Sequence, residues 1–410
     1  MSLLGTGLLF GIVSMSSAVD TDRPEGLGLA DALEQGSMGL SARARYEDVS
    51  LRDDRDAQSP TLSTKISYSS ERYQFFSAQL EYTFVNAITG DDNYFDGSNG
   101  QNDDALVADP DRSFFSRYSL AYDISNTVLR YGRQNLHLDN GRFFGTETHR
   151  QGGSQVRGLT FYNESLNFLS FNAGHLNHFD SAFGSTVVET SPDLRANYFN
   201  AKYSGIIHSE LSFYSYSIDG LGETERWDTQ TDGIRFAGKV ESDFNLSYAF
   251  EIARQKDSGD NDVAYSTRYS LVELGVGAAG ANISAGYESL GAEGDGFFVT
   301  PLASLHDFQG DADVFSNNGL GNITGGISDK YLRLTWDIDE IGVSVAYHRY
   351  EAEERALNTS LADKSLGEEW NARLAYQWQH FAIAARYADY DAHNFGNDTR
   401  KSWIDLSAEF

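Results

Sequence analysis

Hydrophobic and polar residues alternate along short segments through most of this chain. Near the C-terminus, for example, Trp370, Ala372 and Leu374 alternate with Asn371 and Arg373. Successive side chains of a strand point to opposite faces, so a period of two predicts a strand with one apolar and one polar face. The predicted strands lie near 38–48, 61–71, 73–86, 113–123, 126–134, 154–162, 166–177, 195–204, 207–218, 230–240, 243–256, 265–279, 281–290, 327–338, 341–353, 368–379, 380–391 and 401–410.

The connections between these segments alternate in length. Turns of one to three residues alternate with long polar loops, the longest near 87–112, 135–153, 178–194 and 291–326. Transmembrane barrels have short periplasmic turns and long extracellular loops, whereas a soluble sandwich has no reason to place every long loop at one end. We therefore predict an all-β chain, a transmembrane antiparallel up-and-down β-barrel of about 18 strands in the bacterial outer membrane.

The two ends of the chain carry separate signals. An apolar run from Leu3 to Met15 is followed by small residues up to Ala18, which predicts a cleaved signal peptide over residues 1–18; a buried or membrane helix is the alternative. Residues 19–36 then form a periplasmic linker with a short helix over 28–35, and residues 37–410 form the barrel. The terminal Phe410 resembles the signal read by the barrel-assembly machinery, which we expect as a partner.

Composition narrows the function. The chain has no cysteine, so disulfides and thiolate metal sites are excluded. A net charge of −29 argues against nucleic-acid binding, which needs a basic surface. The mean hydropathy of −0.43 does not exclude a membrane barrel, because alternation hides the apolar face. No cofactor is expected. Membrane lipid, lipopolysaccharide and a small hydrophilic solute are the expected partners, with the oligomeric state open between monomer and trimer.

Basic residues predominate on the face opposite the apolar series, while much of the excess acid falls in loops such as 91–111. That acidic stretch could bind Ca²⁺, but its spacing matches no EF-hand loop and favours a solvated surface. The predicted pore-lining basic residues are Arg43, Arg45, Lys65, Arg117, Arg130, Arg235, Arg268, Arg333, Arg373 and Arg386. They could form a belt that attracts anions, or each could pair with a nearby acid and stiffen the wall.

Several segments resemble the alginate-export-type porins, relatives of the 18-stranded substrate-specific porins. The resemblance rests on the stretch 29–49, with Arg-Ala-Arg-Tyr-Glu at 43–47, on VADPDRS at 107–113, on LRYGRQNLHLDNGRFFG at 129–145 and on GDGFFVTPLASLHDFQGDADVF at 294–315. It implies outer-membrane transport of anionic or carbohydrate solutes. The chain departs from the family pattern at Gly141, His149 and Asp311, where the family has larger side chains.

Two loops carry the candidate site residues. Loop 135–153 is the candidate constriction, because it is rich in hydrogen-bonding groups and its glycines allow it to bend into the lumen; its candidates are Arg133, Asp139, Asn140, Arg142 and Arg150. These groups could contact solute, or they could tie the loop to the wall. In the loop 291–326, His306, Asp307 and Asp313 are expected to brace the loop rather than to bind metal.

Three functions compete. The first is a porin for passive diffusion of small anionic solutes, such as carboxylates or acidic saccharides. The second is a nonspecific or cation-preferring porin whose acidic mouth dominates selection. The third is an outer-membrane hydrolase built on a barrel, for which no His pairs convincingly with a Ser or Asp on a neighbouring strand. The sequence therefore favours a channel over an enzyme.

Overall fold

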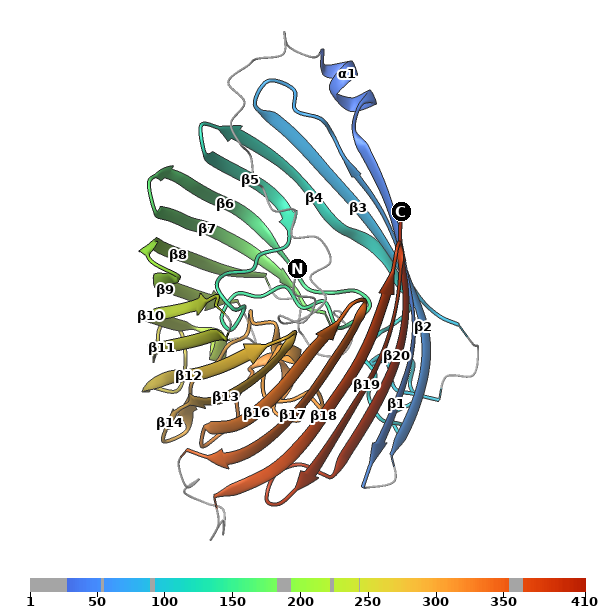
Figure 1. The fold of residues 1–410 in the computed structure, drawn as a ribbon, viewed down its shortest axis with the longest axis vertical. Helices are drawn as coiled ribbons and strands as arrows, with labels where there is room; N and C mark the ends of the chain where they lie inside the picture. Colours follow the sequence, from blue (N-terminus) through green and yellow to red (C-terminus); the bar gives the residue numbers. More distant parts are fainter. Residues whose placement is uncertain are drawn as a thin grey trace.

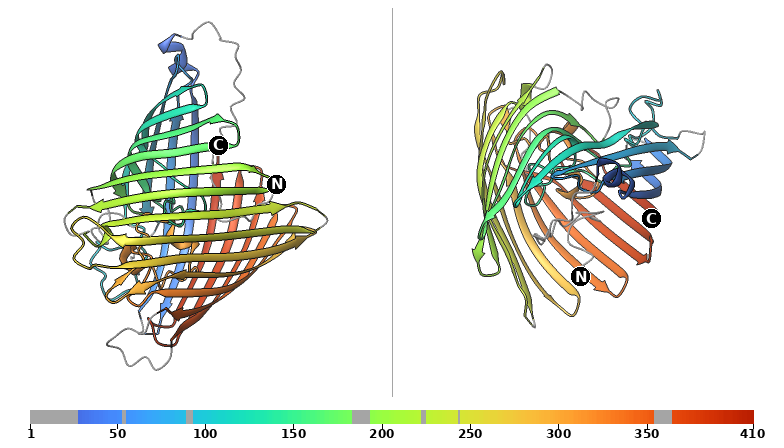
Figure 2. Two further views of the ribbon diagram at one scale, coloured as in Figure 1. Left: turned by 90° about the vertical axis from the view of Figure 1, so that its left-hand side faces the viewer. Right: turned by 90° about the horizontal axis from the view of Figure 1, so that it is seen from above.

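The computed structural model is a closed antiparallel barrel of eighteen strands (Figures 1 and 2). It describes residues 28–52, 55–88, 93–182, 193–221, 225–242, 244–353 and 364–410. Each strand pairs with the next along the chain, and β1 pairs with β20 from Ser41 opposite Glu409 to Leu51 opposite Thr399, which closes the barrel. The predicted fold class is confirmed.

The barrel strands are β1 (Ser37–Leu51), β2 (Asp56–Ser69), β3 (Phe76–Ala87), β4 (Arg112–Ile124), β5 (Thr127–Gln134), β6 (Gln155–Leu166), β7 (Leu169–Asp180), β8 (Asp193–Ile206), β9 (Ser209–Gly220), β10 (Thr229–Val240), β11 (Asn245–Asp257), β12 (Ser266–Ala278), β13 (Ala281–Leu290), β16 (Ile327–Ile338), β17 (Ile341–Ala352), β18 (Ser365–Trp378), β19 (Phe381–Ala392) and β20 (Thr399–Glu409). The other elements are the helix α1 (Leu29–Glu34), the hairpin β14 (Ala292–Glu293) and β15 (Gly296–Phe297), and the 3₁₀ helices η1 (Glu225–Trp227), η2 (Leu305–Asp307) and η3 (Asn317–Gly319).

The predicted strands correspond one to one with the barrel strands, and they differ mainly at their ends. β2 starts at Asp56 rather than near 61, because Pro60 lies within the strand, opposite Tyr46. Proline usually ends a strand, since it cannot donate to the ladder. The hairpin β14–β15 and the 3₁₀ helices inside the longest loop were not predicted. The predicted signal peptide, Asp91, Asp92 and most of the loop 178–194 lie outside the described residues.

The outer wall is apolar. Leu120, Leu274, Leu332 and Ile404 on four different strands are each between 52% and 55% exposed, and they alternate with inward-facing residues. Water would not support so large an apolar surface, whereas the hydrocarbon of a bilayer does. The barrel is therefore a membrane-spanning barrel of the bacterial outer-membrane type. Among the described residues, no helix is long and apolar enough to cross a bilayer.

The interior is filled unequally. Loops 135–154 and 291–326 fold into the barrel, as Figure 1 shows at its centre. Phe143 and Phe144 of the first loop and Phe298 of the second pack against buried tyrosines of the wall, among them Tyr214 and Tyr269. This aromatic cluster occupies the lumen beside β8–β13. Two cavities that remain open are lined from the wall by β16–β20 and β1.

Candidate functional site

Two inward-folded loops meet across the lumen and narrow it. The backbone N–H of Gly145 donates to Leu302 O at 2.9 Å, and the N–H of Ser304 donates to Gly141 O at 3.1 Å. At Gly145 a Cβ atom would lie 2.5 Å from Gly141 O and 2.6 Å from Ser304 N, closer than any side chain fits. Glycine is therefore required where the loops touch.

The carboxylate of Glu147 joins the same two loops a few residues further on. Its Oε1 accepts the backbone N–H of His149 at 2.5 Å, and its Oε2 accepts that of His306 at 3.1 Å. Burial raises the pKa of Glu147, and the nearby Asp307 raises it further. One buried carboxylate thus bridges the two halves of the constriction.

Four of the five constriction candidates lie in loop 135–153, and the fifth, Arg133, lies on β5; all five are bound to the barrel or to their own loop. Arg142 is fully buried, and its guanidinium donates to Glu288 at 2.8 Å and to Thr300 at 3.2 Å. Arg150 donates to Glu47 at 2.8 Å. The remaining contacts are Arg133 with Asp180 at 3.0 Å, Asp139 with Ser212 at 2.8 Å, and the side chain of Asn140 with the N–H of Arg142 at 3.3 Å. The contacts of Arg142, Arg150 and Asp139 anchor the loop to β13, β1 and β9, respectively.

His306 and Asp313 form the corresponding brace within loop 291–326. The Nδ1 of His306 lies 2.8 Å from Asp313 Oδ1, and Lys401 of β20 lies 3.3 Å from Asp313 Oδ2. Burial would lower the pKa of His306, but Asp313 outweighs it and the net shift is upward. Asp307 takes a different place: its carboxylate accepts the Ser304 hydroxyl at 2.5 Å and borders the open cavity.

His149 and His306 stack with their ring centroids 3.5 Å apart, and together with Asp313 they bring three possible metal ligands within 4.8 Å of one another. The surrounding charge opposes a cation there. Arg386 Nη1 lies 3.1 Å from His149 Nδ1, and Arg45 Nη1 lies 3.4 Å from its Nε2. Burial and the neighbouring cations hold the pKa of His149 well below its usual value. His149 therefore stays uncharged between the two guanidinium groups.

The predicted basic wall divides into paired and unpaired groups. Arg45, Arg117 and Arg235 form ion pairs with Asp405, Glu81 and Glu251, respectively. Arg43 bonds mainly to loop 135–153, and its Nε lies 4.0 Å from Asp405. Five of the predicted wall residues have no carboxylate partner within the described part of the chain: Lys65, Arg130, Arg333, Arg373 and Arg386.

Arg268 faces outward, so its assignment to the lumen was wrong. It is exposed and lies opposite Arg254, on the same face of β12 as Val272 and Leu274. The neighbours that point inward are Tyr269 and Leu271, both buried. The inner face is apolar at this height because it packs against the aromatic cluster, so polarity no longer distinguishes lumen from lipid.

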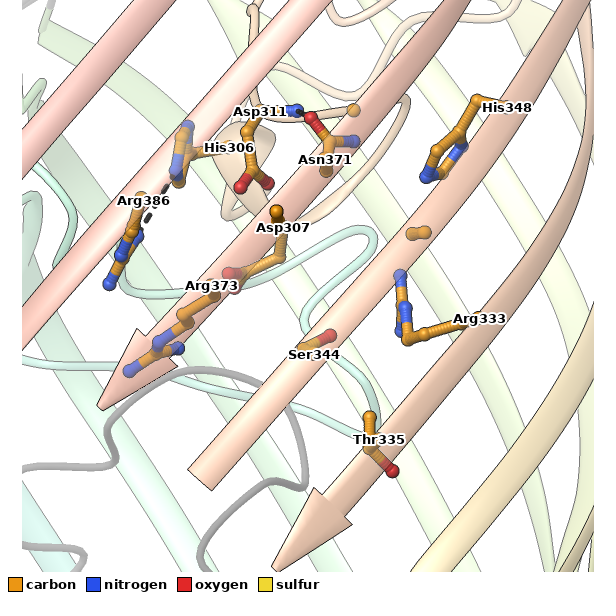
Figure 3. A pocket seen from close by; sticks show the side chains of 13 residues that line it. His306, Asp307, Asp311, Arg333, Thr335, Ser344, His348, Asn371, Arg373 and Arg386 are labelled. Carbon is orange, nitrogen blue, oxygen red and sulfur yellow. Dashed lines mark hydrogen bonds between the residues drawn. The ribbon is translucent and has the colours of Figure 1, made fainter. Parts of the chain in front are cut away.

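A cavity of about 120 Å³ lies between loop 291–326 and the wall (Figure 3). Arg333, Arg373 and Arg386 line its wall side, and Asp307 and Asp311 face them from the loop. A second cavity of about 40 Å³ continues towards Arg43. Both cavities are lined by His306, Asp307 and Arg386. These three residues therefore mark the point where the two spaces join.

Sequence reasoning missed several residues of this site. Asn371 and His348 line the larger cavity, and both lie at inward positions that alternate with the apolar series, so the same rule could have found them. Lys202 also faces inward, 3.2 Å from Glu210. Glu147 carried no such signal, because its role depends on a contact with His306, 159 residues away.

Comparison with solved structures identifies the same fold in outer-membrane proteins. OccK9 (OpdG) of Pseudomonas aeruginosa aligns with a TM-score of 0.72 at 16% identity, over 92% of this chain and 99% of that one. OccAB4 of Acinetobacter baumannii aligns with a TM-score of 0.71 at 15% identity, over 92% and 98%. The outer membrane protein OpdK of P. aeruginosa aligns with a TM-score of 0.69 at 13% identity, over 92% and 99%.

No known family profile matches the sequence, and no curated protein matches it either. At these identities the likeness to solved structures establishes the fold, which is that of the 18-stranded substrate-specific porins. The resemblance to alginate-export-type porins stays a prediction.

Proposed function

We propose that this protein is an outer-membrane porin that lets small hydrophilic solutes diffuse passively and prefers anions, such as carboxylates or acidic saccharides. The observation that carries the proposal is the wall of the larger cavity. Arg333, Arg373 and Arg386 reach it without a carboxylate partner among the described residues. Their charge is uncompensated at close range, so it is available to an anion in the passage.

The porin part of the proposal is supported by the architecture. The structural neighbours are outer-membrane porins, and the chain aligns over nearly the whole length of each. The lumen retains open space beside a structured constriction, as a diffusion channel requires. A solved structure of OpdK carries vanillate, an aromatic carboxylate, which makes compounds of this class useful first solutes to test.

A cation-preferring porin is the second candidate, and one observation favours it. Asp307 and Asp311 line the same cavity opposite the arginines, and the chain as a whole carries a net charge of −29. If the loop carboxylates and the acidic exterior dominate the potential, cations would be favoured instead. The balance between the loop carboxylates and the arginines of the barrel wall decides the ion selectivity.

The test is the reversal potential of the purified protein in a planar bilayer under a salt gradient. We expect a potential of the sign that indicates anion preference, and a shift towards cations when Arg333, Arg373 and Arg386 are all replaced by Gln. Arg400→Gln is the matched control, because Arg400 lies on the outer face. Cation preference in the unmodified protein would refute the anion proposal, and absence of a channel would refute the porin proposal. Hydrolysis of a lipid or peptide panel would instead support a barrel enzyme.

A further inference from the structure

Two arginines lie directly opposite each other on the outer face of the barrel, near its extracellular end. Arg254 of β11 pairs in register with Arg268 of β12, and both side chains are exposed. The loop that joins these strands spans 258–265, at the end of the barrel opposite α1 and Phe410. Like charges directly opposite on neighbouring strands repel each other, so the pair destabilises the wall unless something neutralises it.

The protein itself supplies little neutralisation. Arg254 Nε donates to the Ser266 hydroxyl at 2.8 Å, and neither guanidinium forms an ion pair within the described residues. Lys256, two residues beyond Arg254, adds a third exposed positive charge. Two carboxylates lie close by, but neither forms an ion pair with Arg254 or Arg268 in the described part of the chain. Asp232, opposite Arg254, accepts from Ser215 and Gln230, and Glu293 accepts the N–H of Ser266.

A second like-charge pair on the outer face is neutralised by a carboxylate of the protein itself. Lys330 of β16 lies opposite Arg349 of β17, again on the outside of the barrel. Here Glu351 lies 2.8 Å from Lys330 Nζ and 3.6 Å from Arg349 Nε. One carboxylate thus serves both cations. The pair of Arg254 and Arg268 lacks such a group.

The position of Arg254 and Arg268 on the barrel indicates what could supply the missing negative charge. Beneath the two arginines the outer face becomes apolar, with Phe250 opposite Val272 and both side chains 42% exposed. Arg254 is four residues beyond Phe250, which at about 3.3 Å per residue and a tilt of about 45° places it roughly 9 Å nearer the extracellular surface. The pair therefore lies at the upper edge of the hydrocarbon band, where the headgroups of the outer leaflet begin.

We infer that Arg254 and Arg268, with Lys256, bind a phosphate group of the glycolipid that forms the outer leaflet. A guanidinium matches the geometry of a phosphate with two parallel N–H donors, and two adjacent guanidiniums can hold one phosphate between them. The acyl chains of the same molecule would lie over the apolar strip that contains Phe250 and Val272. The inference goes beyond solute transport, and it holds for either charge preference of the channel.

The experiment measures binding of a fluorescent, phosphorylated lipid A to the full-length protein in detergent micelles. Against the unmodified protein, the variant with Arg254→Gln and Arg268→Gln should bind roughly thirtyfold more weakly, since each cation at a membrane surface contributes about fivefold. The control carries Lys330→Gln and Arg349→Gln, the pair that the protein neutralises itself. It should bind less than about threefold more weakly, because exposed ion pairs contribute little.

Two further binding measurements use only the unmodified protein. Lipid A stripped of its phosphates should bind the unmodified protein about as weakly as phosphorylated lipid A binds the Arg254 and Arg268 variant. Inorganic phosphate should compete poorly, because it lacks the acyl chains that contact the apolar strip. Equal losses in both variants, full binding by the stripped lipid, or efficient competition by inorganic phosphate would each overturn the inference.

Discussion

Arg373 of β18 and Arg386 of β19 lie directly opposite each other on the inner wall. Arg386 Nη1 lies 3.4 Å from His306 Nε2 (Figure 3), and neither arginine has a carboxylate partner within the described part of the chain. Like charges in this arrangement cost stability. Both arginines line the open cavity, so their charge can act on a solute there.

Removing one of the two arginines should therefore separate stability from selectivity. Arg373→Gln should raise the free energy of unfolding by about 0.5 kcal/mol, because it relieves the repulsion from Arg386. The same change should lower the permeability ratio of anions to cations. Urea unfolding in lipid vesicles and the reversal potential measure the two effects. A variant that loses both stability and anion preference would show that Arg373 is structural.

Arg45 should behave in the opposite way. Its side chain is 2% exposed, and it donates to both oxygens of Asp405 at 2.8 and 3.0 Å. Arg45→Ala would leave the Asp405 carboxylate buried without that partner, so the free energy of unfolding should fall by about 3–5 kcal/mol. Urea unfolding provides the measurement.

A double-mutant cycle tests the cause of that loss. If the unpaired carboxylate is responsible, Asp405→Ala added to Arg45→Ala should recover part of the stability. A double variant as unstable as the sum of the two single variants would show that the two residues act independently.

The brace between His306 and Asp313 should make the constriction pH-dependent. His306 has a raised pKa, so its contribution is complete below its usual value of 6.5 and is lost as the pH rises through the raised value. The charges of His306 and Lys401 outweigh burial and lower the pKa of Asp313, so its contribution is complete above 3.8 and is lost as the pH falls through the lowered value. The brace is therefore strongest between pH 3.8 and 6.5.

The expected result is a rise in brief conductance fluctuations as single channels are moved from mildly acidic to alkaline solution. His306→Gln should show the frequent fluctuations at every pH and lose the alkaline dependence. The groups that also face His306 are Glu147, Asp311, Asp307, His149 and Arg386. An alkaline response that persists unchanged in His306→Gln would assign it to one of them.

The sequence predicts the wall of this protein far better than its interior. Every strand could be located because lipid imposes an apolar outer face, so the period of two is visible without knowing any contact. That rule assigned Arg373 and Arg386 to the lumen and failed for Arg268, because β12 is apolar on the inside where it meets the aromatic cluster. The alternation rule could not predict the contacts that anchor the loops, because Arg150 binds Glu47 across 103 residues and no local pattern encodes that contact.

Gly145 offers the most direct test of the contact between the two loops. A Cβ at this position would meet the backbone atoms Gly141 O and Ser304 N at 2.5 and 2.6 Å, and backbone cannot rotate out of the way as a side chain can. Gly145→Ala should force the loops apart and break the hydrogen bond from Gly145 N to Leu302 O. Single-channel conductance should change and fluctuate, while the barrel itself stays folded. Gly39→Ala is the control, because its new methyl group would meet only the Ser67 hydroxyl at 2.7 Å, with the nearest backbone atom at 3.8 Å. If both variants conduct like the unmodified protein, the loop contact does not set the width of the passage.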